Sequence, residues 1–355
     1  MDDFIILIPA YNPPKDILSE YLEKLDKEGF TKIVIVNDGS RSEYIDYFDS
    51  LKNRGFDIFT HHKNLGKGRA LKNAFNYILN TYTKFRYIVT VDSDGQHSVG
   101  DVINIINVIK DEYKPIMYLG ARNFSEKNVP FKSSFGNKST SFFYKVLFHD
   151  KIQDTQTGLR FIPKDFIIDF MDLDGERFEY EINMLINCSR TGKEVVELPI
   201  STLYFDNNSE SHFNPIKDSF KIYKVMFKSF FNFILSSFSS FVIDIISFTL
   251  LLSIFEGSIN SFDRILIATG LARVISGIFN YKLNKNFVFK DDNKDKTKVF
   301  KYIILWLIQL FLSAYLVEMI IVKYNLSASL IKIVVDMFIF MVSFHIQNKH
   351  IFNNR

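Results

Sequence analysis

The chain has 355 residues, enough for two or three domains, and its 43 basic residues nearly balance its 40 acidic residues. A formal net charge of +3 gives no electrostatic basis for binding nucleic acid, so no nucleic-acid partner is expected. The single cysteine, Cys188, excludes an internal disulfide and argues against a thiolate zinc site. No secretory signal is expected, because the first apolar run is short and follows no basic segment.

Up to about residue 215, short β-branched segments alternate with segments of helical spacing. The predicted strands are 4–8, 32–36, 57–60, 87–91 and 116–119, and helical spacing is clearest at 17–25 and 70–78. This alternation predicts βαβ units and a mostly parallel sheet. Ligands of such sheets bind at the carboxyl ends of the strands, so the residues there are the first candidates for function.

Four apolar stretches follow residue 229. They are 230–255, 265–281, 302–322 and 330–346. Each is close to the length of helix that crosses about 30 Å of hydrocarbon. A buried helix of a soluble domain is the alternative for the two shorter stretches. Four such stretches in succession nevertheless predict four transmembrane helices.

The lysines and arginines around these stretches predict their orientation. If the first half is cytoplasmic, nearly all the flanking basic residues lie on the inner side, and only Arg264 and Lys323 lie in the outer loops. Positive charge is retained on the cytoplasmic side of membranes. The expected protein is therefore a multi-pass protein of the cell membrane, with its first half and both termini in the cytoplasm.

An amphipathic helix is expected between the two halves. Apolar side chains recur at helical spacing at Ile216, Phe220, Tyr223, Phe227 and Phe231. A stripe of lysines runs beside them at Lys217, Lys221, Lys224 and Lys228. Such a helix can lie on membrane lipid with its lysines reaching anionic headgroups, although packing on the soluble domain is an alternative. The predicted domains are residues 1–212, a juxtamembrane helix at 213–229 and a membrane domain at 230–355.

The strongest local pattern lies at the end of the predicted strand 87–91. Asp92 and Asp94 follow the strand directly, and Gln96 follows them. Carboxylate and amide oxygens suit Mg²⁺ or Mn²⁺, which can bridge the phosphates of a nucleotide. Asp172 and Asp174 have the same spacing, but only the first pair has a strand that aims it at the ligand edge of the sheet.

Two more strand ends and one turn carry polar groups. Tyr11 can stack on a base, although core packing is the alternative, and Asp38 can accept a hydrogen bond from a uracil N–H. Gly66 and Lys67 belong to a basic turn that opens a helix, where phosphate can bind. The turn has neither the ATPase nor the dinucleotide glycine spacing, and a helix cap with a solvated lysine is the alternative.

Together these segments resemble glycosyltransferase family 2, whose members have a GT-A fold. The resemblance covers residues 1–215, with Ile-Pro-Ala-Tyr-Asn at 8–12, Asn-Asp-Gly-Ser at 37–40, Asn-Leu-Gly-Lys-Gly at 64–68 and Asp-Ser-Asp-Gly-Gln-His at 92–97. Within the family, the chain is most similar to polyprenyl-phosphate hexose synthases, relatives of dolichyl-phosphate mannose synthase. That similarity rests on Gly-Ala-Arg at 120–122, Asp-Thr-Gln-Thr-Gly-Leu-Arg at 154–160 and Ser-His-Phe-Asn-Pro at 211–215.

The resemblance assigns expected roles to residues. Asp92, Asp94 and Gln96 would hold Mg²⁺ or Mn²⁺. The nucleotide sugar would contact Pro9, Ala10, Tyr11, Asp38, Gly66, Lys67 and Asp92. The catalytic candidates are Asp94, Asp154, Arg122 and Arg160, with both arginines facing phosphate. Candidates for contact with the acceptor or the membrane are Lys132, Lys138, Glu181, Lys217, Lys221 and Arg273. Pro13 and Asn37 depart from the mannose synthase pattern, which bears on the identity of the donor.

The second half resembles the GtrA-like family of four-helix membrane proteins, which occur beside or fused to such transferases. The matching segments are 273–276, 280–285 and 287–289, and residues 348–352 repeat them faintly. Arg273 is costly inside a membrane, so it is expected to pair with Asp244, with Asp336 or with a lipid phosphate. Serines at 236, 237, 239 and 240 permit close helix contacts, including those of a homo-oligomer.

The two resemblances imply an α/β GT-A catalytic domain fused to an all-α membrane domain. The expected activity is a metal-dependent, inverting transfer of a hexose, with glucose as the first choice, from a UDP-sugar to polyprenyl (undecaprenyl) phosphate at the inner leaflet. The product would serve cell-surface polysaccharide or teichoic acid glycosylation. The alternatives are a GDP-mannose-dependent polyprenyl-phosphate mannosyltransferase, a lipid-linked sugar translocase, and a membrane domain that only anchors and oligomerises the transferase.

Overall fold

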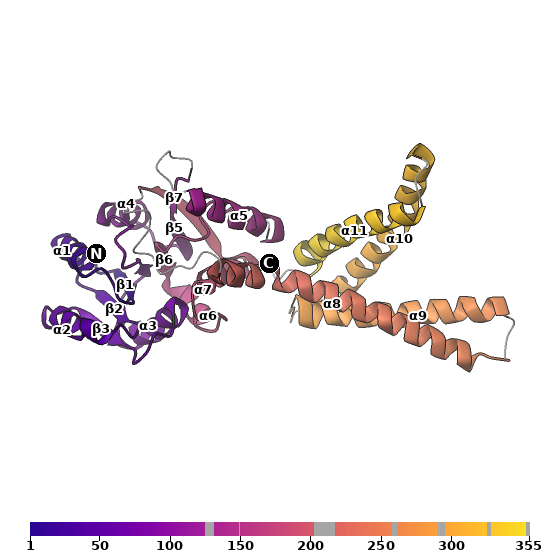
Figure 1. Ribbon diagram of the computed structural model, residues 1–355, viewed down its shortest axis with the longest axis horizontal. Coiled ribbons are helices and arrows are strands. Elements are labelled where there is room, and N and C mark those ends of the chain that lie inside the picture. The colour runs from indigo at the N-terminus through magenta and orange to yellow at the C-terminus, as the bar shows by residue number, and fades with distance from the viewer. Residues whose placement is uncertain are drawn as a thin grey trace. The chain divides into compact units, whose positions relative to one another are not determined.

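The structure is a computed structural model that describes residues 1–124, 131–148, 150–201, 217–257, 261–289, 291, 295–324 and 328–352. The chain forms two compact units, Met1–Met226 and Phe227–Arg355 (Figure 1). The Ser211–Pro215 motif and the start of the expected juxtamembrane helix lie outside the described residues.

The first unit is built on a seven-stranded mixed sheet in the order β3-β2-β1-β4-β6-β5-β7 (Figure 1). The strands are β1 (Phe4–Ala10), β2 (Ile33–Asn37), β3 (Asp57–Thr60), β4 (Tyr87–Thr90), β5 (Ile116–Arg122), β6 (Arg160–Pro163) and β7 (Glu194–Ile200). Only β6 runs antiparallel to its neighbours, β4 and β5. The sheet is therefore mostly parallel and Rossmann-like, as the sequence predicts.

Helices cover both faces of this sheet. They are α1 (Lys15–Lys27), α2 (Ile45–Asn53), α3 (Lys67–Thr81), α4 (Val99–Ile109), α5 (Phe131–Phe148), α6 (Ile167–Met171) and α7 (Glu179–Thr191). Ile6 and Ile8 of β1 share one buried cluster with Leu18 and Leu22 of α1, because alternate side chains of a strand point to the same face. Apolar spacing at every third or fourth residue gives α1 and α3 their buried stripes.

The sequence predicts β1 to β5 but not β6 or β7. Strand β6 has four residues, begins with Arg160 and ends with Pro163, so only two apolar residues lie between them. Strand β7 lies at the edge of the sheet, and Glu194 and Glu197 interrupt its apolar residues. Both strands pair with strands far away in the chain, which the sequence alone does not show.

The described part of the second unit is helical. Its elements are α8 (Lys217–Ile254), whose residues 217–226 belong to the first unit, then α9 (Ser261–Leu283), α10 (Thr297–Tyr324) and α11 (Ala328–Ile346). Helices α9 and α11 each continue into a π-helical segment, at Asn284–Val288 and Gln347–Ile351. The two matching ends coincide with the faint sequence repeat.

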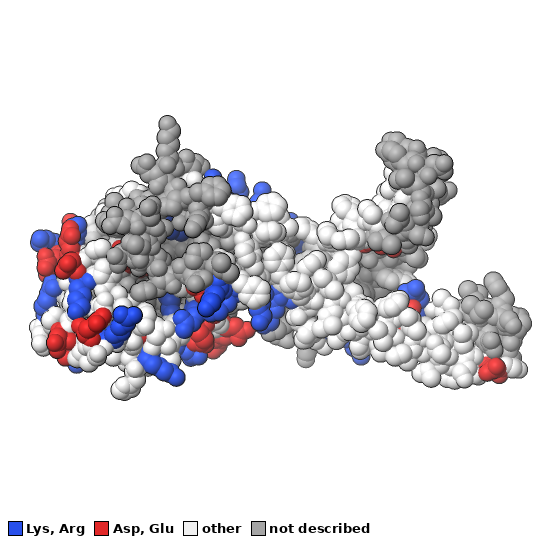
Figure 2. All heavy atoms as spheres, in the orientation of Figure 1, with Lys and Arg blue, Asp and Glu red and all other residues white. Residues whose placement is uncertain are grey.

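Two segments of the described residues are long and apolar enough to cross a membrane, Lys217–Ile254 and Thr297–Val317. Only 11% and 12% of their most apolar stretches are buried, whereas a core helix of a soluble domain would be mostly buried. On the face drawn in Figure 2, charged side chains gather on the first unit, and the described part of the second unit is almost uncharged. This distribution is that of a protein with one unit in water and one in lipid.

The start of α8 packs against the first unit. Ile222 and Met226 are buried, and the hydroxyl of Tyr223 lies 3.0 Å from that of Ser139 on α5. Phe220, in contrast, is 69% exposed, and Lys217 and Lys224 are exposed on the same helix. One side of the start of α8 thus packs on the rest of the first unit, while the side that carries Phe220, Lys217 and Lys224 is exposed.

Replacing Phe161 with alanine tests the importance of β6. Phe161 is fully buried and packs edge-on against Phe4, so Phe161→Ala is expected to lower the free energy of unfolding by about 3–5 kcal/mol. Ile168→Ala on α6, where the side chain is 67% exposed, should change it by less than about 0.5 kcal/mol. Denaturant unfolding of the full chain in detergent, followed by tyrosine circular dichroism, measures both. Equal effects of the two variants would contradict this role of β6.

Candidate active site

A cavity of about 270 Å³ lies at the carboxyl ends of β1, β2 and β4. Its lining includes every residue predicted to contact a nucleotide sugar, namely Pro9, Ala10, Tyr11, Asp38, Gly66, Lys67 and Asp92. Asp94 lines it as well. The structure therefore gathers in one place residues from three strand ends and one turn, which lie between Pro9 and Asp94 of the sequence.

The ends of β1 and β2 are held together by hydrogen bonds that position Tyr11. Asn12 has a positive φ of 45°, which asparagine tolerates better than most residues. Its backbone N–H donates to the Ser40 hydroxyl at 2.9 Å, and its side-chain oxygen accepts from the Arg41 N–H at 2.9 Å. These bonds fix the turn directly after Tyr11 at the rim of the cavity.

The carboxylate of Asp38 is hydrogen-bonded to the loop that precedes α3. Its carboxylate accepts hydrogen bonds from His61 Nδ1 (2.7 Å), Asn64 Nδ2 (3.1 Å), Leu65 N (2.9 Å) and Gly66 N (2.8 Å). These donors occupy both carboxylate oxygens. In this geometry Asp38 acts on the site by placing Gly66 and Lys67, and its expected bond to a uracil N–H stays a prediction.

Two glycines allow the backbone to approach closely at this site. Gly66 has a φ of +98°, and a Cβ there would lie 2.4 Å from the carbonyl oxygen of Glu176. At Gly158 a Cβ would lie 2.1 Å from Oδ2 of Asp92. Any side chain at Gly158 would thus displace the carboxylate of Asp92.

Lys67 is the positive centre of the cavity. Its ammonium nitrogen lies 2.6 Å from Oδ1 of Asp92 and 3.0 Å from Oε1 of Glu181, and His97 lies 3.7 Å from Oδ2 of Asp92. Burial raises the pKa of Asp92, but Lys67 and His97 outweigh it and hold that pKa well below its usual range. Burial lowers the pKa of Lys67, but Asp92 and Glu181 outweigh it and raise that pKa. Both groups are therefore charged at neutral pH.

Asp94 has the opposite electrostatic environment. Burial and then the neighbouring carboxylate of Asp92 raise the pKa of Asp94, and the Gln96 N–H, 3.1 Å from Oδ1, offsets this only in part. Lys67 therefore does not neutralise all the negative charge that faces the cavity. A buried excess of negative charge is unfavourable, so the site favours an additional cation.

These donors fit Mg²⁺ or Mn²⁺. Both metals prefer oxygen ligands, and Mg²⁺ is commonly held by one or two carboxylates together with substrate phosphates and water. Within the described part of the chain, no group of three or more His, Cys, Asp or Glu side chains could hold a metal by itself. Asp92 and Asp94 face the cavity, whereas Gln96 does not line it, so substrate and water would complete the coordination.

Arg122 and Asp154 form a pair of their own. Asp154 is fully buried and accepts from Nε (2.7 Å) and Nη2 (3.0 Å) of Arg122 and from its backbone N–H (3.1 Å). The guanidinium also lies over the Phe124 ring, 4.9 Å from its centroid. Neither residue is among the described residues that line the cavity. Asp154 is thus a partner that orients Arg122.

The expected contact of Arg160 with phosphate is not supported. Its side chain is fully buried and donates to the carbonyl oxygens of Thr157 (2.9 Å), Glu181 (2.7 Å) and Thr155 (3.3 Å). It also lies 3.8 Å from Oε1 of Glu181. Arg160 therefore fixes the start of α7, and with it the carboxylate that holds Lys67.

The remaining candidates are not among the described residues that line the cavity. Lys138 is exposed on α5, Lys217 is exposed in the first turn of α8, and Lys221 lies 3.8 Å from Asp218. The side chain of Lys132 lies outside the described residues. In the second unit, Arg273 pairs with Asp244 at 3.5 Å, which is one of the three partners expected for it.

Arg177, Phe178 and Asp218 also line the cavity, and none of them is predicted from the sequence. Arg177 and Phe178 precede α7 and follow no strand, so a search of strand ends does not reach them. Asp218 stands alone among the lysines at the start of α8. Its burial on a basic helix face is the only signal that could have singled it out.

Comparison with known proteins follows these boundaries. Residues 5–170 match glycosyl transferase family 2, and residues 223–352 match the GtrA/DPMS transmembrane domain. The chain therefore contains a family 2 glycosyltransferase domain and is a glycosyltransferase. It carries this domain together with a helical GtrA/DPMS transmembrane domain and is a membrane protein.

Curated relatives are similar over part of the chain. An uncharacterised protein of Methanocaldococcus jannaschii is 29% identical over 232 residues, covering 64% of this chain and 90% of its own. UDP-N-acetylglucosamine–dolichyl-phosphate N-acetylglucosaminyltransferase of Methanococcus voltae is 27% identical over 220 residues, covering 56% and 85%. Among solved structures, glucosyl-3-phosphoglycerate synthase from Mycobacterium tuberculosis, in complex with Mn²⁺, UDP and phosphoglyceric acid, has a TM-score of 0.48 at 12% identity, covering 64% of this chain and 78% of that one.

Asp94→Asn is expected to raise the unfolding temperature at pH 7 in the absence of divalent cations. The raised pKa of Asp94 means that its ionised form is less favourable in the folded than in the unfolded state, so a neutral isostere removes a penalty. The gain should shrink as the pH falls through the pKa of Asp94, because the wild-type carboxyl then binds a proton. Thermal unfolding of the full chain between pH 7 and pH 4 measures it. The exposed Asp172→Asn is the control, and a lower unfolding temperature of Asp94→Asn at pH 7 would contradict the assignment.

Proposed function

We propose that the protein transfers a hexose from a UDP-sugar to a polyprenyl phosphate at the membrane surface, with inversion and with the help of Mg²⁺ or Mn²⁺. The observation that carries the proposal is the cavity at the ends of β1, β2 and β4. It places an aromatic ring, a buried ammonium and two carboxylates of unequal pKa around one space. These groups match the base, the diphosphate and the metal of a nucleotide-sugar complex.

The relatives support this choice of donor and acceptor. The Methanococcus voltae enzyme is named for transfer from a UDP-sugar to dolichyl phosphate, a polyprenyl phosphate. A lipid acceptor also agrees with the transmembrane domain that the chain carries. We therefore favour a UDP-sugar over GDP-mannose, with glucose as the first hexose to test.

Different residues of the cavity would bind different parts of the donor. Tyr11 can stack on the base, and the N-terminus of α3 at Gly66 and Lys67 presents positive potential to the diphosphate. A divalent cation held by Asp92 and Asp94 would neutralise charge that develops on the departing diphosphate. Lys67 can exchange its contact with Asp92 for one with phosphate, because both groups line the same cavity.

The acceptor requires little proton transfer. A phosphate monoester has a second pKa near 6 and is largely a dianion at about pH 7, so it is already nucleophilic. Asp154 is bound on both oxygens by Arg122, which makes it a poor general base. We infer that the chain accelerates the displacement mainly by orienting donor and acceptor.

We also propose that α9 and α11 cross the membrane together with α8 and α10, with the first unit and both termini in the cytoplasm. The basic residues that flank these helices support this orientation. The donor cavity and the head of the lipid acceptor would then share the cytoplasmic side. Accessibility labelling of single cysteines placed in the loops, in a Cys188→Ser background, tests the topology.

The central test is lipid mass spectrometry of purified protein incubated with undecaprenyl phosphate, Mg²⁺ or Mn²⁺ and a panel of nucleotide sugars. Wild-type protein is expected to form a hexosyl lipid from a UDP-sugar, and Asp94→Ala should lower the rate by at least about 100-fold while remaining folded. Asp172→Ala, from the other Asp-x-Asp pattern, is the matched control and should retain activity.

A second readout does not depend on turnover. Mn²⁺ together with UDP should raise the unfolding temperature of wild-type protein but not that of Asp94→Ala. Full activity or full Mn²⁺ response in Asp94→Ala would remove the metal assignment. Absence of any glycolipid from the whole panel with wild-type protein would contradict the proposed function itself.

A further inference from the structure

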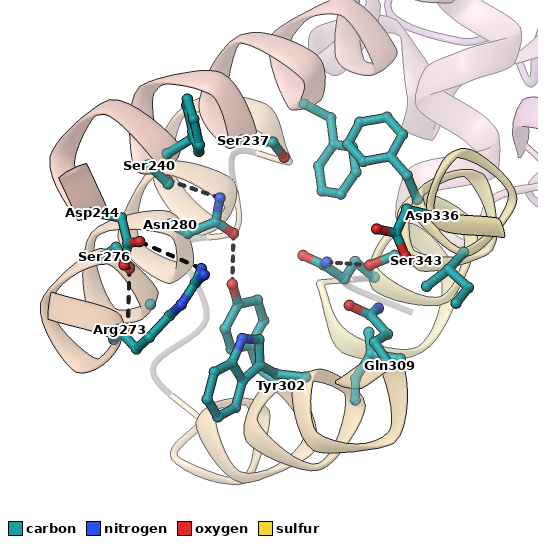
Figure 3. Close-up of a pocket in the computed structure, with 18 of the residues that line it drawn as sticks. Ser237, Ser240, Asp244, Arg273, Ser276, Asn280, Tyr302, Gln309, Asp336 and Ser343 are labelled. Atoms are coloured by element: carbon teal, nitrogen blue, oxygen red, sulfur yellow. Dashed lines mark hydrogen bonds and ion pairs between the residues drawn. The ribbon is translucent and has the colours of Figure 1, made fainter. Parts of the chain in front are cut away.

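Each unit of the chain has a cavity lined by polar side chains. In the second unit, α8, α9, α10 and α11 surround a cavity of about 410 Å³ (Figure 3). Several of its polar groups bond to one another: Tyr302 donates to Oδ1 of Asn280 at 2.6 Å, and Nδ2 of Asn280 donates to Ser240 at 2.9 Å. Nε2 of Gln309 is buried in its wall without a hydrogen-bond partner among the described residues. The donor cavity of the first unit differs, because the guanidinium of Arg177 in its lining is free.

Arg177 lines the donor cavity and is exposed. Its guanidinium makes no hydrogen bond, ion pair or ring contact with any residue that the structure describes. The other arginines around the site have partners within the first unit, namely Arg69, Arg122 and Arg160. Arg177 can therefore bind a ligand in the cavity without giving up a contact with the protein.

The turn that carries Arg177 is fixed between α3 and α7. The carboxylate of Glu176 accepts from Nε (2.5 Å) and Nη2 (2.7 Å) of Arg69 and from Nζ of Lys72 (3.0 Å), both on α3. Oε1 of Glu179, at the start of α7, accepts from the backbone N–H groups of Glu176 (3.1 Å) and Arg177 (3.3 Å). The backbone of Arg177 is thus held in place, while its guanidinium is left without a protein partner.

The side chain of Arg177 begins beside the N-terminus of α3. A Cβ at Gly66, the residue before α3, would lie 2.7 Å from Cγ of Arg177, so a side chain there would meet the stem of the arginine. A Cβ at Gly68 would lie 2.9 Å from the carbonyl oxygen of Arg177. The N-terminus of a helix carries positive potential and can hold phosphate. Arg177 therefore adds a full positive charge at a helix end that is already suited to an anion.

The other charges of the site leave the diphosphate of a UDP-sugar without a counter-charge of its own. Lys67 and a divalent cation would together carry three positive charges. The three carboxylates around them, Asp92, Asp94 and Glu181, carry three negative charges. Two more carboxylates line the cavity and add negative charge to it, namely Asp38 and Asp218. Arg177 would supply positive charge that these groups do not already balance, with planar N–H donors that match phosphate oxygens.

We propose that Arg177 is a further donor-binding residue, whose guanidinium binds the phosphate oxygens of the nucleotide. This inference rests on the proposed function, because the nucleotide belongs to the donor of that reaction. The phosphate of the polyprenyl acceptor offers the same chemistry, and the experiment distinguishes the two sources. The position of Arg177 beside Gly66, at the end of α3 that faces the donor cavity, favours the nucleotide.

Isothermal titration calorimetry of the full chain in lipid nanodiscs, with UDP and Mn²⁺, tests this contact. Arg177→Gln should weaken the binding of UDP by about 10-fold, as expected for a lost charge-assisted hydrogen bond. Arg177→Lys retains the charge and should recover part of the affinity. Because the side chain is exposed, the difference between wild type and Arg177→Gln should shrink at high salt. Equal losses in the two variants, independent of salt, would overturn the contact with phosphate.

The unfolding temperature without nucleotide separates ligand binding from a structural role. Arg177→Gln should unfold at the wild-type temperature, since the guanidinium has no partner among the described residues. Arg54→Gln is the matched control, because Arg54 is an exposed arginine of the first unit that does not line the donor cavity, and it should leave UDP affinity unchanged. Unchanged UDP affinity in Arg177→Gln, or weaker binding together with a lower unfolding temperature, would overturn the proposal.

Glycolipid synthesis separates the donor from the acceptor. Arg177→Gln should raise the KM for the UDP-sugar by about 10-fold and leave the KM for polyprenyl phosphate at the wild-type value. The reverse result would assign Arg177 to the acceptor phosphate and overturn the proposal. Normal synthesis by Arg177→Gln contradicts only the role of Arg177. UDP binding that depends on Arg177, without any glycolipid formed by wild-type protein, contradicts only the transfer reaction.

Discussion

The donor cavity depends on an imbalance of charge around one ammonium group. Lys67 is shared by Asp92 and Glu181, and Asp94 stands beside them without a cation of its own. The guanidinium of Arg160 donates its hydrogen bonds to backbone carbonyls, so it cannot supply the missing charge. The fold therefore keeps a site with excess negative charge at the edge of the sheet. The turn at Asn12 and the loop around Asp38 place binding groups around this site.

The second unit meets a related problem in a different solvent. Its outer surfaces are apolar, and its amides and hydroxyls turn inward, where they bond to each other or remain open to the cavity. Excess negative charge identifies the site of the first unit, which lies in water. In the second unit, which lies in lipid, a polar group without a partner, such as the amide of Gln309, identifies a site equally well, because lipid cannot form the missing hydrogen bond.

Sequence reasoning reached the parts of the fold that have strong local signals. Strands β1 to β5 were predictable because their segments are rich in β-branched residues, and the helical stretches of the second half because their apolar runs are long. The lining of the cavity followed from the ends of parallel strands. Strands β6 and β7 were not, since their pairing depends on neighbours far away in the chain. The buried position of Arg160 and its bonds to backbone carbonyls could not be predicted, because a motif shows which residues are present but not whether a side chain points outward. Asp218 was missed because it reaches the cavity from a helix that begins more than a hundred residues after Asp94.

The two π-helical segments give the second unit a mechanical property. Asn284 and Gln347 open these segments and meet through a single amide contact, which is linked on one side to Asn280 and on the other to Ser343. This amide contact therefore joins the first helix pair to the second, as the bond from Tyr302 to Asn280 also does. A rearrangement that separates the two pairs would break both bonds, so these polar contacts raise its free-energy cost.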